Sequence, residues 1–524
     1  MSKKYYITTA IDYVNGHPHL GHAYEKVITD VIARAHRSLG DDAFFLTGLD
    51  EHGQKVQQAA MAEGMDAQAY CDQLAESWQS FSGKLGISIG DFIRTTQPRH
   101  KQVVSAILSK LHANGHFYKS RYEGFYSTRQ ETFLTDKDRN EDGSWPEIYG
   151  EVNELSEENY YFKLSDHQQW LIDHIEANED FVRPASRRNE VLGLLKNNKL
   201  EDLCISRPRE RLTWGIPLPF DSDYVTYVWF DALTNYITVP AARGDRAVLE
   251  PLGLDAIDEP QTDVAEASLW PADAHVVGKD ILKFHAVYWP IMLHVAGVPL
   301  PKQILVHGWW QKDGDKISKT TGNIVEPVQI IDEWGLDAFR YYVVRELDIG
   351  PDGNWTDEGF AARYNAELVN GLGNLLNRSL KMLARYRDGV LPERSDELAP
   401  EVSGIVKEVR ASLSGNRLQQ ALTGIWKIVS VGNKYVDSTE PFKLAKDPAQ
   451  ANRLNEILYN LAETGRILAV LIDPFLPDTA AKMREQLAWS GSSGRLSDAE
   501  WGGLLAGHKI GSPEGLFPRR ESKS

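Results

Sequence analysis

Two histidines near the N-terminus stand at a spacing that allows them to act on one ligand. His19 and His22 are three residues apart at the start of a helix predicted over residues 20–39, so they lie on one face of its first turn. Gly21, between them, would let a flat group such as adenine pack against the backbone. A strand predicted over residues 5–11 and a tight turn precede this helix. Together, the strand, the turn and the helix N-terminus predict a phosphate or nucleotide site.

Two other interpretations of this stretch remain open. His17, His19 and His22 fall within six residues and could bind a metal ion, although the nearby chain has no cysteine and the run is a turn rather than one helix face. Polar residues at this point could also do no more than cap the helix.

A second stretch, far downstream, places two positive charges close together. Lys316 and Lys319 flank Ser318 in a segment rich in Gly, Asp and Thr, which is typical of a mobile arm. In this order, His-Leu-Gly-His and Lys-Ile-Ser-Lys-Thr resemble the paired HIGH and KMSKS motifs of class I aminoacyl-tRNA synthetases. The resemblance implies that catalysis depends on His19, His22, Lys316 and Lys319, and that these four bind ATP together with Gly21 and Ser318. It also implies ATP as the cosubstrate and Mg²⁺ bound with it.

The elements that must position these residues follow from the same resemblance. It implies an α/β fold: a Rossmann-like parallel-sheet catalytic domain with a small inserted domain, followed by an α-helical bundle. The sequence becomes rich in strands and loops after residue 116, and helical periodicity dominates beyond residue 351. We therefore expect five parts, over residues 1–116 (catalytic, first half), 117–211 (inserted domain), 212–300 (catalytic, second half), 301–357 (stem-contact region with the lysine-bearing loop) and 358–524 (helical, anticodon-binding).

Further residues resemble the amino-acid pocket of methionyl-tRNA synthetases. Trp229, Leu233 and Tyr236 recur at one face of a predicted helix, which by spacing alone more often means core packing. An aromatic pocket with few polar groups suits a flexible thioether. Asp50 follows a predicted strand over residues 43–50, where it could meet the ligand's ammonium group. The resemblance implies a methionine site formed by Ala10, Ile11, Tyr13, Asp50, Trp229, Leu233, Tyr236, Ile281, His285 and Trp289. It also implies that Gly278 and Asp280 bind ATP, with Asp280 accepting from the ribose hydroxyls.

The inserted stretch bears on metal content and on substrate. Residues 126–130 read Tyr-Ser-Thr-Arg-Gln where many methionine enzymes have a Tyr-Cys-x-x-Cys zinc knuckle, so we expect no zinc and an apolar core around Phe125, Phe133, Tyr160 and Phe162. Synthetases for valine, isoleucine and leucine have much larger inserts that house a second, hydrolytic site. The short insert therefore favours an enzyme that selects its amino acid with one pocket.

The helical part contains a polar ridge. Asn370, Asn374 and Arg378 recur every four residues on an otherwise apolar helix, which could be a solvated face. The ridge resembles the anticodon-reading helix of methionyl-tRNA synthetases, whose partner element corresponds to Asp437, Pro441 and Phe442. The family generally has tryptophan where this chain has Phe442, and phenylalanine can still stack on a base.

Composition limits the remaining possibilities. A formal charge of −17 argues against nonspecific nucleic-acid binding, and two cysteines cannot build a disulfide framework. With no long apolar run and no leader, we expect a cytoplasmic monomer without a membrane span. The expected partners are L-methionine, ATP and tRNA(Met), both initiator and elongator. Open alternatives are a sister class I synthetase, a simple nucleotidyltransferase and a non-catalytic RNA-binding relative.

Overall fold

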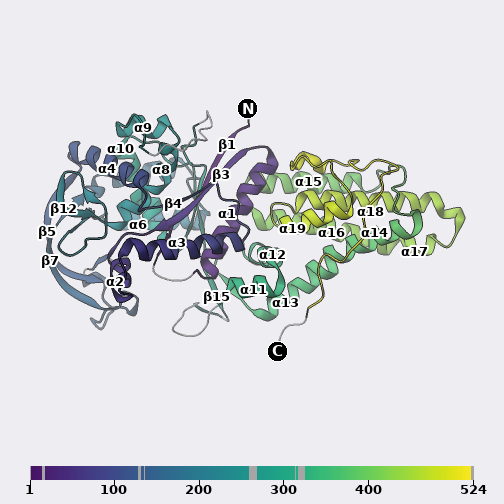
Figure 1. Cartoon of the computed structure of the whole chain (residues 1–524), viewed down its shortest axis with the longest axis horizontal. Coiled ribbons are helices and arrows are strands. Elements are labelled where there is room, and N and C mark those ends of the chain that lie inside the picture. Colours follow the sequence, from purple (N-terminus) through teal and green to yellow (C-terminus); the bar gives the residue numbers. More distant parts are fainter. Residues whose placement is uncertain are drawn as a thin grey trace.

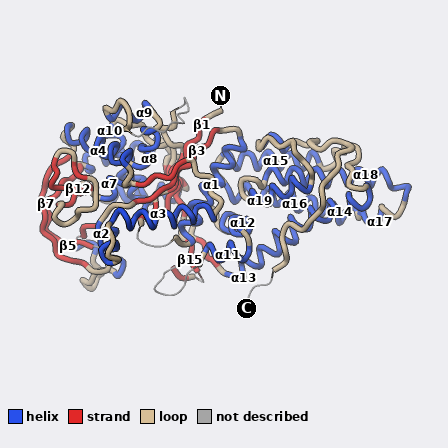
Figure 2. The backbone as a smooth tube through the Cα atoms, in the orientation of Figure 1, coloured by secondary structure: helices blue, strands red, loops and turns tan. Residues whose placement is uncertain are grey.

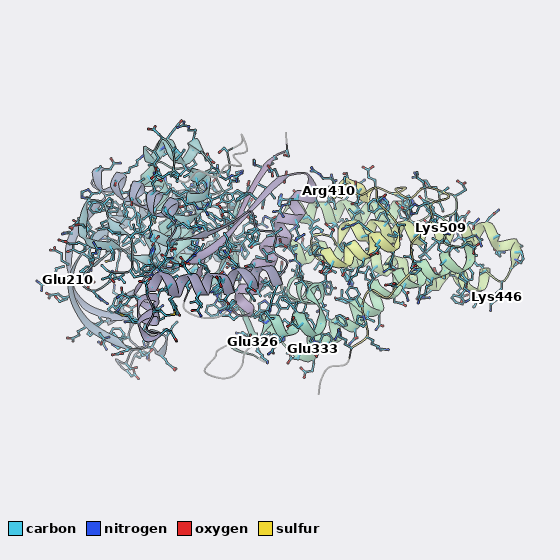
Figure 3. All side chains as sticks on the ribbon, in the orientation of Figure 1. Glu210, Glu326, Glu333, Arg410, Lys446 and Lys509 are labelled. Atoms are coloured by element: carbon cyan, nitrogen blue, oxygen red, sulfur yellow. The ribbon has the colours of Figure 1, made fainter. Side chains whose placement is uncertain are left out.

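The computed structural model describes residues 2–14, 18–127, 132–134, 136–258, 268–312, 314–316 and 325–520, except the side chains of Tyr122, Thr132, Phe133, Leu155, Asp315 and Lys316. The molecule is elongated, with mixed strands and helices in one half and helices alone in the other (Figures 1 and 2). Figure 3 shows Glu210 near one tip and Lys446 near the opposite tip. The chain is therefore an α/β unit followed by a helical bundle, which confirms the predicted fold class.

A seven-stranded sheet organises the α/β half. Its order is β2-β3-β1-β13-β14-β8, with β4 beside β3, and every pairing is parallel. Residues such as Ile7, Phe45, Val276 and Val306 are fully buried because helices cover both faces of the sheet. The strands are β1 (Lys4–Thr9), β2 (Asp12–Tyr13), β3 (Asp42–Asp50), β4 (Asp91–Arg94), β8 (Val182–Arg183), β13 (Ala274–Gly278) and β14 (Ile304–His307).

Helix α1 (Leu20–Leu39) agrees with the predicted helix, and it ends where Gly40 adopts a φ of 107°. Its buried stripe, including Val27, Val31 and Ala35, packs against the sheet and against the helical half. The other helices around the sheet are α2 (Gln54–Ala62), which was not predicted, α3 (Ala67–Lys84), α4 (Pro98–Ala113), α7 (Val228–Leu233), α8 (Asn235–Ala242), α9 (Arg246–Leu252) and α10 (Trp289–Ala296).

The stretch expected to contain strands and loops has both, but it also has helices. A four-stranded antiparallel sheet has the order β6-β5-β7-β9. β10 belongs to a three-stranded sheet of the order β10-β12-β11, whose other two strands follow residue 211. Helices α5 and α6 contradict the expectation of strands and loops because buried Leu171, Ile172 and Ile175 follow helical spacing. The elements are β5 (Phe117–Ser127), β6 (Thr132–Leu134), β7 (Val152–Phe162), α5 (Gln168–Ala177), α6 (Ala185–Asn197), β9 (Leu203–Cys204), β10 (Ser206–Pro208), β11 (Pro217–Leu218) and β12 (Asp221–Thr226).

Two of the aromatic residues expected to form one core in this stretch lie in different places, and the Phe133 side chain falls outside the part that the structure describes. Phe162 is fully buried against Phe117 and Phe230, whereas Phe125 packs on Trp145 with ring centroids 5.1 Å apart. The long β5–β7 hairpin separates them, because they lie near opposite ends of its register. The expectation of one apolar core was therefore wrong for these two residues.

A small sheet connects the two halves, and a bundle follows it. The sheet has the order β16-β15-β17, with β15 (Trp310–Lys312), β16 (Asp315–Lys316) and β17 (Gly353–Trp355). A π-helical segment, Tyr364–Gly373, joins α13 to α14. The helices are α11 (Pro327–Trp334), α12 (Leu336–Glu346), α13 (Asp357–Arg363), α14 (Asn374–Arg387), α15 (Ala399–Ser414), α16 (Leu418–Thr439), α17 (Pro441–Leu444), α18 (Ala451–Leu471) and α19 (Pro477–Gln486). No helix in the described ranges is both long and apolar enough to cross a membrane.

Candidate active site

A cavity of about 580 Å³ opens at the carboxyl ends of β1, β3, β13 and β14. Ligands of open parallel sheets bind at this edge. Fourteen of the predicted site residues line the cavity: Ala10, Ile11, Tyr13, His19, Gly21, His22, Asp50, Trp229, Leu233, Tyr236, Gly278, Asp280, Ile281 and His285. Segments far apart in the sequence therefore meet around one space, as the resemblance implied.

The two motif histidines cap α1 and also face the cavity. The His19 ring accepts a hydrogen bond from the Gly21 backbone N–H at its Nδ1 (3.1 Å), and the His22 Nδ1 accepts one from the His19 backbone N–H (3.1 Å). A neutral ring that accepts at Nδ1 carries its proton on Nε2. The capping interpretation is thus correct in geometry, and it leaves room for a second role because both residues line the cavity.

The glycines of the site are needed for close packing. A Cβ on Gly278 would lie 2.5 Å from Asp280 Oδ1, and one on Gly21 would lie 3.0 Å from the His19 ring. Asp280 Oδ1 also accepts a hydrogen bond from Trp309 Nε1 at 3.1 Å. Any residue larger than glycine at position 278 would displace this carboxylate.

One wall of the cavity is aromatic and electrically neutral. Trp229 stacks on Phe284 with ring centroids 3.6 Å apart. Tyr236 donates its hydroxyl proton to His285 Nε2 (2.7 Å), and His285 Nδ1–H donates to the Ile281 carbonyl (2.9 Å). Burial lowers the pKa of His285 to about 4, so its ring is uncharged at neutral pH. Such a wall suits an apolar ligand group that needs few hydrogen bonds.

Trp289 lies behind this wall instead of lining it. It is fully buried, with its ring centroid 5.8 Å from that of Tyr236, and its indole N–H donates to His275 Nε2 at 3.3 Å. Ile281, His285 and Trp289 are four residues apart and would share one face of a regular α-helix, but Phe284–Tyr288 forms a π-helical turn. The wider turn rotates Trp289 off the face that the other two share.

Several buried polar residues around the cavity were not predicted from the sequence. Beneath the aromatic wall, Asp231 accepts from His52 at 2.6 Å and from His100 at 2.7 Å. Burial alone would raise the pKa of Asp231, but the two histidines hold it at about 2. On the other side, Glu25 pairs with His307 at 3.0 Å, and this bond raises the pKa of His307 although burial opposes it.

These partners join residues that are up to 282 positions apart, so sequence spacing could not pair them. The one signal available was in α1, where the charged residues Glu25, Lys26 and Asp30 fall within the buried part of the helix. A charge on a buried helix face needs a partner. Lys55, Trp309 and Gln311 also line the cavity and were likewise not predicted.

The remaining predicted residues fall elsewhere. Lys316 lies in β16, where the structure describes its backbone only, and Ser318 and Lys319 fall beyond the described ranges, as does His17. Within those ranges, no group of three or more His, Cys, Asp or Glu side chains could hold a metal ion.

The predicted anticodon residues gather in the helical half. Arg378 of α14 pairs with Asp437 of α16 at 3.3 Å, which joins the two predicted elements. Asn370 is exposed and Asn374 is half-buried on the same helical run as Arg378. Phe442 is 42% exposed at the start of α17, whereas Pro441 beside it is buried. A large exposed aromatic side chain near paired polar groups can stack on an unpaired base.

Among the classes that the sequence left open, only the class I aminoacyl-tRNA synthetases need both this cavity and an appended helical bundle. The family model of class I tRNA synthetases (M) matches residues 5–151 and 141–380, and that of the anticodon binding domain of methionyl tRNA ligase matches residues 387–523. The chain belongs to the methionyl-tRNA synthetase family.

Individual relatives agree over nearly the full length. The methionine–tRNA ligase of Rickettsia felis is 40% identical over 99% of both chains. That of Fusobacterium nucleatum is also 40% identical, over 99% of this chain and 80% of its own length. The structure of Mycobacterium tuberculosis methionyl-tRNA synthetase in complex with methionyl-adenylate superposes with a TM-score of 0.88 at 37% identity, covering 99% of this chain and 100% of that one.

Proposed function

We propose that this chain activates L-methionine with ATP in the cavity described above, forming methionyl-adenylate and pyrophosphate, and then transfers the methionyl group to tRNA(Met). The observation that supports this most strongly is that the histidine-capped N-terminus of α1 and the neutral aromatic wall face one cavity. The first suits the phosphates of ATP and the second suits a thioether side chain.

The cavity divides naturally between the two substrates. We assign methionine to Ala10, Ile11, Tyr13, Asp50, Trp229, Leu233, Tyr236, Ile281 and His285, with Trp289 supporting Tyr236 from behind. Asp50 is the carboxylate that would bind the ammonium group of methionine. We assign ATP to His19, Gly21, His22, Gly278, Asp280, Lys316, Ser318 and Lys319, with Asp280 accepting hydrogen bonds from the ribose hydroxyls.

The activation step needs alignment and positive charge more than it needs a base. The methionine carboxylate is already an anion, so it can attack the α-phosphate directly while pyrophosphate leaves. Negative charge that develops on the phosphates would be stabilised by His19, His22, Lys316 and Lys319. Mg²⁺ bound with ATP would supply further positive charge, and we assign it no ligand from the protein.

The helical half would bind the tRNA. We propose that Asn370, Asn374, Arg378, Asp437 and Phe442 contact the anticodon of initiator and elongator tRNA(Met), with buried Pro441 orienting Phe442. The five parts expected from the sequence would then divide the work: catalysis in residues 1–116 and 212–300, the insert in 117–211, stem contacts in 301–357 and anticodon reading in 358–524.

We also propose that the enzyme is a cytoplasmic monomer. Both cysteines are buried free thiols, as suits a reducing compartment. The large hydrophobic side chains that are exposed in the described ranges come from separate elements, so they form no broad apolar interface. Light scattering of the purified protein should give the mass of one chain, and the mass of a dimer would contradict this part of the proposal.

The proposal as a whole is tested by charging. Purified protein, labelled methionine and ATP should aminoacylate transcripts of both initiator and elongator tRNA(Met). A transcript with one altered anticodon base serves as the matched control and should be charged much more slowly. Equal charging of the altered and unaltered transcripts would contradict anticodon recognition. No charging of the unaltered transcripts would contradict the proposed transfer step.

A further inference from the structure

A buried ion pair lies in the wall of the cavity, directly beside one of the motif histidines. Asp12 is 6% exposed and Lys26 is fully buried, and the Lys26 ammonium donates a hydrogen bond to Asp12 Oδ2. The same ammonium lies 3.4 Å from Thr47 Oγ1 and 5.8 Å from the centroid of the Trp78 ring. The other carboxylate oxygen, Asp12 Oδ1, lies 3.9 Å from His22 Nε2. Asp12 is thus placed between a buried cation and a cavity-lining imidazole.

Fold stability alone does not account for this arrangement. Removing two charges from water costs several kcal/mol per ion, and apolar residues of similar volume often serve as well or better. Asp12 stands in the two-residue strand β2, and Lys26 lies on the buried face of α1 between buried Glu25 and Val27. Asp12 also lines the cavity together with His22, and Lys26 is buried behind it.

The hydrogen bonds of His22 define what Asp12 does. His22 Nδ1 accepts from the His19 backbone N–H, so the proton of the neutral ring is on Nε2, the atom that faces Asp12. A carboxylate on that side favours the Nε2–H form of the ring and orients it, while the other tautomer would break the cap of α1. At 3.9 Å, Asp12 Oδ1 is beyond hydrogen-bond distance from Nε2, so the carboxylate fixes the tautomer through its charge. The same Nε2–H can then donate to a phosphoryl oxygen when ATP binds.

We propose that Asp12 is a positioning residue for adenylate formation: it holds His22 as the Nε2–H tautomer facing the phosphates of ATP, and Lys26 keeps Asp12 ionised. This inference rests on the proposed function of the same cavity. It adds two residues to which neither motif points, and it predicts that the charge state of Asp12 controls the reaction rate.

The surroundings of Asp12 set the pH at which this control acts. Burial raises the pKa of Asp12, Lys26 opposes that rise and Glu25 adds to it, with the result that the pKa is about 6. The other charged or titratable groups nearby are His19 and His22 at the start of α1, Asp50 at the end of β3, opposite Tyr13, and Lys55 of α2, whose ammonium lies 5.2 Å from the Tyr13 ring centroid. From α3 the neighbour is uncharged Trp78. Below about pH 6, Asp12 gains a proton and loses its hold on His22.

Three variants separate this role from a structural one. Asp12→Asn removes the charge, Lys26→Met removes the cation that favours it, and the double variant removes both, so that no unpaired charge is buried if a single variant fails to fold. Asp42→Asn is the matched control, because it breaks an Asp–Lys pair with Lys4 at the opposite, amino-terminal edge of the same sheet. The assay is methionine-dependent exchange of labelled pyrophosphate into ATP from pH 5 to 9, with thermal unfolding measured in parallel.

The expected results are specific. Asp12→Asn and the double variant should slow exchange about tenfold or more at pH 8 with the KM for methionine little changed. Both should lose the decline in rate near pH 6 that the wild type has. Lys26→Met should move that decline to higher pH, because an unpaired buried carboxylate has a higher pKa. ATP titrates identically in every assay, so differences between the profiles belong to the enzyme.

Other outcomes would overturn the inference. A wild-type rate and an unchanged acid limb in Asp12→Asn would show that His22 does not depend on Asp12. Equal changes in rate and in the KM values of both substrates, together with a lower melting temperature, would mean that the pair is only structural. Absence of methionine-dependent exchange in the wild type would instead overturn the proposed function, and this inference with it.

Discussion

His285 and Tyr236 illustrate how single residues of the site are constrained. Their hydrogen bond uses the one acceptor nitrogen of His285, since the other nitrogen donates to Ile281. Replacing His285 with alanine would leave the buried Tyr236 hydroxyl without this acceptor and would open the wall of the methionine pocket. We expect weaker methionine binding by about 1–3 kcal/mol and poorer discrimination against other amino acids.

The measurement is pyrophosphate exchange with methionine and with leucine at several concentrations. His508→Ala, in the helical half, is the control and should keep the wild-type ratio of kcat/KM values. Unchanged selectivity in His285→Ala would show that this residue only packs in the core and does not select the amino acid.

At the residue scale, much of the site was predictable because its residues follow strand ends and helix starts. His19, His22, Asp50 and Asp280 are of this kind. Trp289 was misplaced because a π-helical turn is not visible in the spacing of apolar residues. Asp12 was missed for another reason: it follows a predicted strand near a turn, and aspartate is common in turns because its side chain bonds to the nearby backbone.

At the scale of elements, α17 presents Phe442 just after the end of α16, where Asp437 pairs with Arg378 of α14. If this side chain stacks on an anticodon base, Phe442→Ala should weaken tRNA binding by about 1–3 kcal/mol and leave tRNA-independent exchange unchanged. Phe442→Trp should keep or improve binding, because indole offers more stacking area. The measurement is the KM for tRNA(Met) in aminoacylation.

Leu505→Ala is a matched control, since Leu505 is 74% exposed in the same half of the molecule and is not one of the predicted anticodon residues. An equal effect of Leu505→Ala and Phe442→Ala would contradict specific stacking by Phe442.

Histidines near the contact between α5 and α10 have shifted pKa values, from which we predict how the stability of the protein depends on pH. His294 of α10 stacks on Trp170 with ring centroids 3.7 Å apart, and the His167 ring centroid lies 5.7 Å from that of His294. Burial lowers the pKa values of His116, His167, His174 and His294, and the charge of His294 further lowers those of His167 and His174. Their folded pKa values are therefore below the value of about 6.5 expected in the unfolded chain.

The direction in which the free energy of unfolding changes with pH follows from proton binding. As the pH falls through about 6.5, the unfolded chain takes up more protons at these sites than the folded protein, so the free energy of unfolding decreases. Urea unfolding at pH 7.5, 6.0 and 5.0 should show this loss, and His294→Gln should make it smaller. His112→Gln, which removes a histidine of α4 outside this group, is the control; a slope in His294→Gln equal to that of the wild type would contradict the explanation.

At the scale of the whole molecule, one buried side chain ties the two halves together. Arg340 of α12 is fully buried, and it donates to Asp30 of α1 at 2.7 Å and to the carbonyls of Leu85, Pro474 and Phe475. Burial alone would raise the pKa of Asp30, but Arg340 and Arg34 lower it overall. This network fixes the sheet relative to the bundle, and hence the distance between the cavity and Phe442.

Arg340→Met should destabilise the protein by about 3–5 kcal/mol, because buried Asp30 keeps only Arg34 as a cation and three carbonyls lose the donor that Arg340 supplies. Adding Asp30→Asn should recover part of that loss. Lys427→Met breaks an exposed pair with Glu408 and should cost no more than about 1 kcal/mol. The measurement is urea unfolding of the wild type and the three variants. Equal stability of Arg340→Met and Lys427→Met would show that the hydrogen bonds of Arg340 contribute little to the free energy of unfolding.

The division into a parallel-sheet half and a helical half was predictable from the change in periodicity along the chain. The contact between the two halves was not predictable, because Arg340, Asp30 and Phe475 lie far apart in the sequence and nothing in their local patterns links them. Helices α5 and α6 were missed for a related reason: a run of aromatic and acidic residues before them resembled a continuing set of strands and loops.

The most direct test of the central claim is exchange of labelled pyrophosphate into ATP, measured with each of the twenty amino acids in the absence of tRNA. The neutral aromatic wall and the histidine-capped helix predict exchange that depends on methionine alone. Exchange driven as strongly by another amino acid would contradict the assignment of the pocket, and no exchange with any amino acid would contradict the assignment of the cavity to amino-acid activation.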